Sequence, residues 1–135
     1  MTEFEHVTTN ETVETYTSSS GIFESLLMEI RELSKKKPEA TLSKEKVKIV
    51  NRVLEDLLTF LKNEPTGKYL EVLNDEMMPQ MSDALLVMVQ FESALDSFKK
   101  RYRTYVYALE GRKWITKELL VELEELENED EYEDE

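Results

Sequence analysis

A chain of 135 residues, of which 40% are hydrophobic, is long enough for one hydrophobic core and too short for two. The absence of cysteine excludes disulfide bonds and thiolate metal sites, and the scarcity of glycine and proline, three of each, favours an all-α fold. The chain begins without the positive and apolar regions of a signal peptide, and no uncharged stretch approaches the about eighteen apolar residues of a membrane span, so we expect a soluble, cytoplasmic protein without membrane contact.

The formal net charge of −13 is divided into blocks of alternating sign along the chain. Residues 99–117, called the basic segment below, hold seven cations and one anion, whereas residues 118–135 hold eleven anions and no cation. Blocks of this size predict complementary patches, either within one molecule or between copies. A charged helix face that is simply solvated is the alternative for any one block.

Residues 1–20 are rich in threonine, serine and glutamate, and their isolated apolar residues cannot bury enough surface to offset the entropy of ordering. We therefore expect this segment to be disordered. Strand-like composition on both sides of a Thr-Thr-Asn turn leaves a hairpin over residues 4–16 as the alternative.

Apolar residues at three- and four-residue spacing predict a helix from Ser20, its expected N-cap, to about residue 33, and a second helix from Lys44 to Asn63. The loop residues 63–67 then precede a shorter helix, expected over residues 68–78 and ended or kinked by Pro79.

A long central helix is expected from Gln80 to Glu110. Residues 84–89 are apolar all round, which indicates a helix centre surrounded by other elements. The stripe continues through Phe98, Tyr102, Tyr105 and Leu109, so these tyrosines are expected to face inward, and Gly111 would end the helix. A hairpin of residues 104–107 with 113–116 is the alternative, and we favour the helix because the stripe continues in phase.

A last helix is expected to begin near Thr116 and to bury its leucines up to Leu126. The acidic tail, residues 128–135, is expected to be disordered. The sequence thus predicts an all-α, single-domain bundle of four to five helices over residues 21–127, between a disordered segment (1–20) and the acidic tail.

Most enzyme classes need a base or a ligand set that this chain lacks. His6 is the only histidine, and it lies in the segment expected to be disordered. Nucleophile mechanisms that depend on a positioned histidine or a thiol are therefore excluded, as are metal sites that need several histidines. Carboxylate pairs such as Asp75 with Glu76 are common in so acidic a chain and are expected to be solvated. We expect no catalysis, no cofactor and no metal.

The candidate site residues are charged side chains of the basic segment and the acidic tail. The acidic tail follows the basic segment after a short stretch of chain, so its effective concentration near these cations is high. It would therefore compete with phosphate for them. We therefore expect the basic segment to receive an acidic partner, either this chain's own tail or that of a neighbouring copy, and a nucleic acid is disfavoured. The residues are Lys99, Lys100, Arg101, Arg103, Arg112, Lys113, Glu129, Asp130, Glu131, Glu133, Asp134 and Glu135.

These features favour a non-enzymatic acidic interaction protein, an accessory factor or inhibitor that presents acidic surface to a basic site on a larger protein partner, such as nucleic-acid-handling machinery. One alternative is a self-assembling structural protein, for example a virion or scaffold component, whose blocks join copies head to tail. Another is a nucleic-acid binder that uses residues 99–117 and is autoinhibited by the acidic tail.

Overall fold

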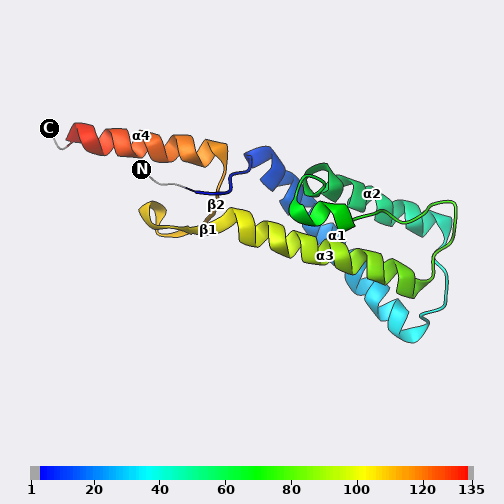
Figure 1. Cartoon of the computed structure of the whole chain (residues 1–135). Helices are drawn as coiled ribbons and strands as arrows, with labels where there is room; N and C mark the ends of the chain where they lie inside the picture. Colours follow the sequence, from blue (N-terminus) through cyan, green and yellow to red (C-terminus); the bar gives the residue numbers. More distant parts are fainter. Residues whose placement is uncertain (1–3, 134–135) are drawn as a thin grey trace. The chain divides into compact units, whose positions relative to one another are not determined.

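The computed structural model describes the backbone of residues 4–133 and the side chains of residues 4–129. It is mostly helical, as the sequence predicts, with one two-stranded sheet (Figure 1). The elements are helices α1 (Asn10–Lys36), α2 (Lys44–Leu61), α3 (Met81–Tyr102) and α4 (Lys117–Glu133), the 3-10 helices η1 (Pro65–Tyr69) and η2 (Tyr107–Leu109), and strands β1 (Arg103–Val106) and β2 (Gly111–Trp114). No helix in this part of the chain is long and apolar enough to cross a membrane.

The chain divides into two compact units. The first, called the helical unit, is Thr15–Phe98, and the second, called the terminal unit, combines residues 1–14 with residues 99–135. Both α1 and α3 contribute residues to each unit.

Three helices build the core of the helical unit. The ring centroid of Phe98 in α3 lies 4.9 Å from that of Phe60 in α2 and 5.7 Å from that of Tyr16 in α1. The apolar residues whose spacing predicts the first two helices are mostly buried, but Ile22 is 58% exposed. The buried apolar residues recur at helical spacing: Phe23, Leu27 and Ile30 in α1, Val47, Val50, Leu54, Leu57 and Leu61 in α2, and Ala84, Met88, Phe91, Leu95 and Phe98 in α3.

The helix predicted over residues 68–78 is wrong. η1 ends at Tyr69, and the chain then runs without helix to α3. Buried Asn51 of α2 explains the change, because its amide donates to the carbonyl of Leu73 and accepts from the N–H of Leu73, both at 2.8 Å. These bonds satisfy the Leu73 backbone without a helix, while Leu70 and Leu73 enter the core.

The prediction of disorder for residues 1–20 is also wrong over the described residues 4–20, and residues 1–3 lie outside the described part. Thr8 donates its N–H to the carbonyl of Ile115 (2.9 Å) and accepts from the N–H of Lys117 (3.0 Å), and α1 begins two residues later, at Asn10. The hydroxyl of Thr9 accepts from the N–H of Thr12 at 3.2 Å, as an N-cap does. The two partners of Thr8 lie more than 100 residues away in sequence, so local composition could not indicate these contacts.

The long helix predicted over residues 80–110 is confirmed only as far as Tyr102. Beyond that residue β1 and β2 form an antiparallel hairpin, so the hairpin alternative is confirmed, with strands one or two residues earlier than expected. β-branched and aromatic residues at positions 104–107 favour a strand. The carbonyl of Tyr102 accepts from the N–H of Ile115 at 2.7 Å, which gives the end of α3 a partner outside the helix.

The last helix begins as predicted. Thr116 precedes α4, and its buried hydroxyl accepts from the N–H of Leu119 at 3.0 Å. Buried Val106, Ile115 and Leu123 form the small core of the terminal unit. The helix continues to Glu133, so the expected disorder from residue 128 is wrong as far as the backbone is described.

Candidate functional site

The β1–β2 hairpin places cations and aromatic rings on one surface. In its register Arg103 lies opposite Trp114, and Tyr105 lies opposite Arg112. Opposed residues of an antiparallel pair share a face, as do residues two apart on one strand. These four side chains therefore share one face of the hairpin, called the arginine–aromatic face below.

The tyrosines of this hairpin are open to water. Tyr105 is 43% exposed, and Tyr107, directly after β1, is 85% exposed. Their ring centroids are 4.8 Å apart at 69°, an edge-to-face contact. The inward orientation predicted for Tyr105 is wrong, because the chain leaves the helical phase at Arg103. Tyr102, the last residue of α3, is half-buried, and the ring of His6 lies edge-on to it at 6.2 Å.

The structure brings together part of the predicted basic set. Arg103 and Arg112 share the arginine–aromatic face, whereas Lys113 pairs with Thr104 and belongs to the opposite face. Lys99, Lys100 and Arg101 occupy the last turn of α3, immediately before β1. Lys100 and Arg101 each have an interaction within the chain, and the Arg101 guanidinium lies 5.9 Å from the Tyr102 ring centroid.

Within the described part of the chain, two arginines and a lysine of the hairpin have no carboxylate partner. Among the side chains that the structure describes, those of residues 4–129, no carboxylate forms an ion pair with Arg103, Arg112 or Lys113. Arg112 and Lys113 are exposed, and Arg103 is half-buried. A guanidinium without a carboxylate can bind a phosphate or carboxylate oxygen pair in bidentate geometry.

The predicted acidic site residues lie on or beyond the end of α4. Glu129 is an exposed residue of α4, and residues 130, 131 and 133 (Asp130, Glu131 and Glu133) also lie within this helix, although their side chains are outside the described part. Asp134 and Glu135 fall outside the described residues. The contact of these carboxylates with the basic segment therefore stays a prediction.

One acidic residue of α4 has a structural role. Both carboxylate oxygens of Glu118 lie 3.2 Å from the backbone nitrogen of Asn10, the first residue of α1. A carboxylate at a helix N-terminus accepts an otherwise unpaired N–H and complements the helix dipole. Glu118 thus ties the starts of α1 and α4 together.

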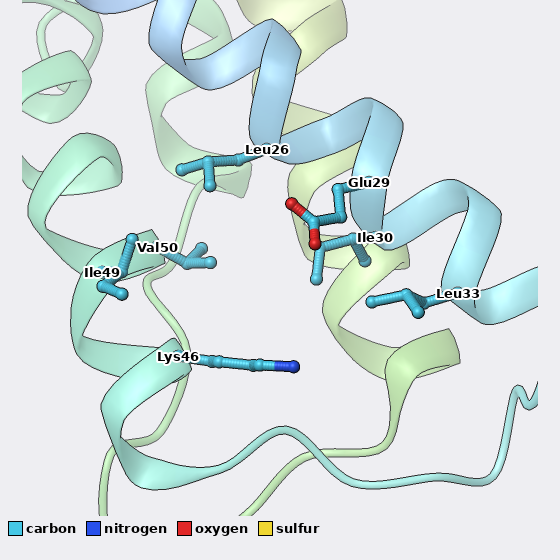
Figure 2. Close-up of a pocket in the computed structure, with 7 residues that line it drawn as sticks. All are labelled: Leu26, Glu29, Ile30, Leu33, Lys46, Ile49 and Val50. Carbon is cyan, nitrogen blue, oxygen red and sulfur yellow. The ribbon is translucent and has the colours of Figure 1, made fainter.

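The helical unit contains an apolar pocket of about 210 Å³ between α1 and α2 (Figure 2). Ile30 and Val50 form part of its wall, and Lys46 and Glu29 extend toward it from opposite sides. Ile49 also lines the pocket and is 51% exposed. Its walls offer aliphatic contact, and no described hydrogen bond or ion pair positions Lys46 or Glu29 for a ligand.

The described residues contain no group of three or more histidine, cysteine, aspartate or glutamate side chains placed to hold a metal ion. No family model matches the chain, and no curated protein or solved structure matches it.

The cations of the hairpin were predicted from the sequence, but Tyr105 and Tyr107 were missed as surface residues. The alternation of β-branched and aromatic residues from Thr104 to Tyr107 is the signal that indicates them.

Proposed function

We propose that this protein is a non-catalytic interaction protein that binds a polyanionic partner through the arginine–aromatic face of its β1–β2 hairpin. The observation that carries the proposal is that Arg103 and Arg112 share this face and have no carboxylate partner among the described side chains.

Electrostatics support a polyanion as the ligand. Lys99 at the end of α3, Lys113 on the opposite face of the hairpin and Lys117 at the start of α4 extend the positive charge around the two arginines. Several anionic groups on one ligand release several counterions on binding, which gives affinity that a single anion does not have. The chain has a formal charge of −13, and the basic segment, with seven cations and one anion, concentrates the attraction on a local surface.

A second candidate uses the acidic surface instead. α4 holds Glu122, Glu124, Glu125, Glu127 and Glu129 exposed on a regular helix. This helical display supports the function that the charge balance favours, an accessory factor or inhibitor that offers carboxylates to a basic site on a larger protein. A homo-oligomer in which α4 of one copy contacts the hairpin of the next combines both surfaces.

The test compares Arg103→Gln/Arg112→Gln with the wild-type chain and with Arg52→Gln, an exposed arginine of α2, as the matched control. Binding of inorganic polyphosphate is measured by calorimetry at low and at moderate salt. We expect wild-type affinity to fall steeply as salt rises, and each lost arginine to weaken binding by at least about tenfold. Arg52→Gln should bind like the wild type.

Equal polyphosphate affinity in the double variant would contradict the proposal. The proposal would also be contradicted if the wild-type chain did not bind polyphosphate but bound a poly-lysine peptide. That result is the one expected if the acidic surface of α4 is the binding surface.

A further inference from the structure

We infer that the polyanion is a single-stranded nucleic acid, whose bases stack on Tyr105 and Tyr107 while its phosphates pair with Arg103 and Arg112. This inference rests on the proposed function and names the ligand of the same surface.

The exposed rings are the first argument. Tyr107 is 85% exposed and Tyr105 43% exposed, although both lie in a hairpin whose Val106 is only 1% exposed. The edge-to-face contact between the two rings covers at most one face of one ring, so ring faces remain open. Every base has a π-face, and stacking on such rings is the common way in which proteins hold unpaired bases.

The spacing of charge and ring is the second argument. Arg112 lies directly opposite Tyr105, which places the two Cβ atoms about 5 Å apart. A base stacked on the tyrosine therefore keeps its own phosphate within reach of a guanidinium. Arg103 is two residues from Tyr105 on the same face, and Lys99 in the last turn of α3 extends the positive charge along the preceding chain.

Other polyanions use only half of this surface. In a duplex the base faces are already stacked on one another, so duplex DNA offers phosphates to the arginines and no base face to the tyrosines. An acidic polypeptide likewise offers carboxylates to the arginines but no regular series of planar rings. Single-stranded nucleic acid is the ligand that engages both Arg112 and Tyr107.

The short hairpin and the negative charge of the chain limit the number of nucleotides that the hairpin can contact. The two strands have four residues each and span about 13 Å, and acidic residues predominate over most of the remaining chain. The hairpin thus contacts few phosphates. If three are neutralised, the logarithm of the association constant should fall with the logarithm of the salt concentration with a slope of about −2.

The test uses the full chain and a fluorescein-labelled oligothymidine of about 15 nucleotides, long enough for a small single-strand site. Binding is followed by fluorescence anisotropy. Competitors are the unlabelled oligonucleotide, a duplex of the same length, inorganic polyphosphate and a poly-glutamate peptide. We expect the unlabelled single strand to be the strongest of the four competitors.

The variants separate stacking from charge. Tyr107→Ala should weaken oligothymidine binding by about fivefold to a hundredfold and leave polyphosphate binding unchanged, because only the bases use the ring. Tyr107→Phe keeps the ring and should bind like the wild type. Tyr69→Ala removes a 64% exposed tyrosine of η1 and serves as the matched control.

The outcomes distinguish this inference from the proposed function. Polyphosphate binding that needs Arg103 and Arg112, together with oligothymidine binding that Tyr107→Ala leaves unchanged, would overturn the stacking inference and leave the proposed function standing. Stronger competition by the duplex or by poly-glutamate than by the single strand would have the same meaning. A wild-type chain that binds none of these polyanions would overturn both the stacking inference and the proposed function.

Discussion

Glu110 shows how one residue affects both the shape and the charge of the hairpin. Its backbone is left-handed, with φ 51° and ψ 45°, between η2 and β2. A side chain in this conformation brings Cβ close to the following carbonyl, and glycine avoids that contact. The sequence predicted Gly111 as the residue that ends the long helix, but the left-handed position is one residue earlier, at Glu110. Glu110 is also the only carboxylate of the basic segment.

Glu110→Gly should raise the free energy of unfolding by about 0.5–1 kcal/mol, because relief of the left-handed strain exceeds the added entropy of the unfolded chain. Glu110→Gln removes the charge and keeps the strain, so its free energy of unfolding should change little. Both substitutions should strengthen polyphosphate binding to a similar extent. Urea unfolding and calorimetric titration measure the two effects, and equal stabilisation by Gln and Gly would show that charge, not backbone strain, is responsible.

The two glycines of the helical unit differ in whether the structure has room for a side chain. Gly21 lies within α1, and a Cβ atom added there would meet no atom within 4 Å. Gly67 lies in η1, where a Cβ atom would come within 2.5 Å of the carbonyl oxygen of Leu61 and 2.6 Å of that of Lys62. The end of α2 and η1 can pack this closely only because Gly67 has no side chain.

Gly21→Ala should therefore stabilise the protein by about 0.5–1 kcal/mol through helix propensity. Gly67→Ala should destabilise it by about 1–3 kcal/mol, because rigid backbone must move to admit the methyl group. The pair makes the same chemical change in two environments, and denaturant unfolding with a common slope compares them. Destabilisation by both would mean that α1 does not behave as a regular helix at residue 21.

The sequence predicted elements whose signals are local. The stripe of Val47, Val50, Leu54 and Leu57 specifies α2 and its buried face, and the residues around Thr116 specify the start of α4. It failed for elements whose stability depends on distant partners. Residues 70–80 are apolar enough for a helix, but Asn51 provides backbone hydrogen bonds from another element.

The sequence predicted the cations of the candidate site but not their arrangement on a hairpin. Phe98, Tyr102 and Tyr105 fit one helix face, and a short apolar spacing of this kind cannot exclude a change to strand. The hairpin alternates residues between its faces, so Arg103 and Arg112 come to share a surface with Tyr105. That change of period turned a predicted core residue into a surface residue.

At the scale of the whole molecule, repulsion between like charges outweighs the attraction within the ion pairs. The chain carries a formal charge of −13. The ion pairs Glu32–Lys35 and Glu45–Lys48 are exposed and lie within single helices, and Arg31–Glu92 (3.4 Å) joins α1 to α3 with both partners partly exposed. Exposed pairs contribute little, whereas a net charge far from zero destabilises the compact state.

Raising sodium chloride from about 0.01 M to about 0.1 M, which shortens the Debye length from about 30 Å to about 10 Å, should therefore raise the melting temperature. Relief of about 1 kcal/mol of repulsion corresponds to about 2–4 °C. Circular dichroism at 222 nm measures it, with a non-ionic osmolyte as the control for solvent effects. A lower melting temperature at the higher salt would show that attraction between the charge blocks dominates.

The hydrogen bonds between Thr8 and both Ile115 and Lys117, and between Asn10 and Glu118, join positions more than 100 residues apart. During synthesis residues 8–10 therefore remain without these partners until residues 115–118 have left the ribosome. Closing so large a loop is slow compared with forming local helices. The terminal unit, and the hairpin within it, should thus form after the helical unit, so the proposed binding surface would become available only once residues 115–118 have been made.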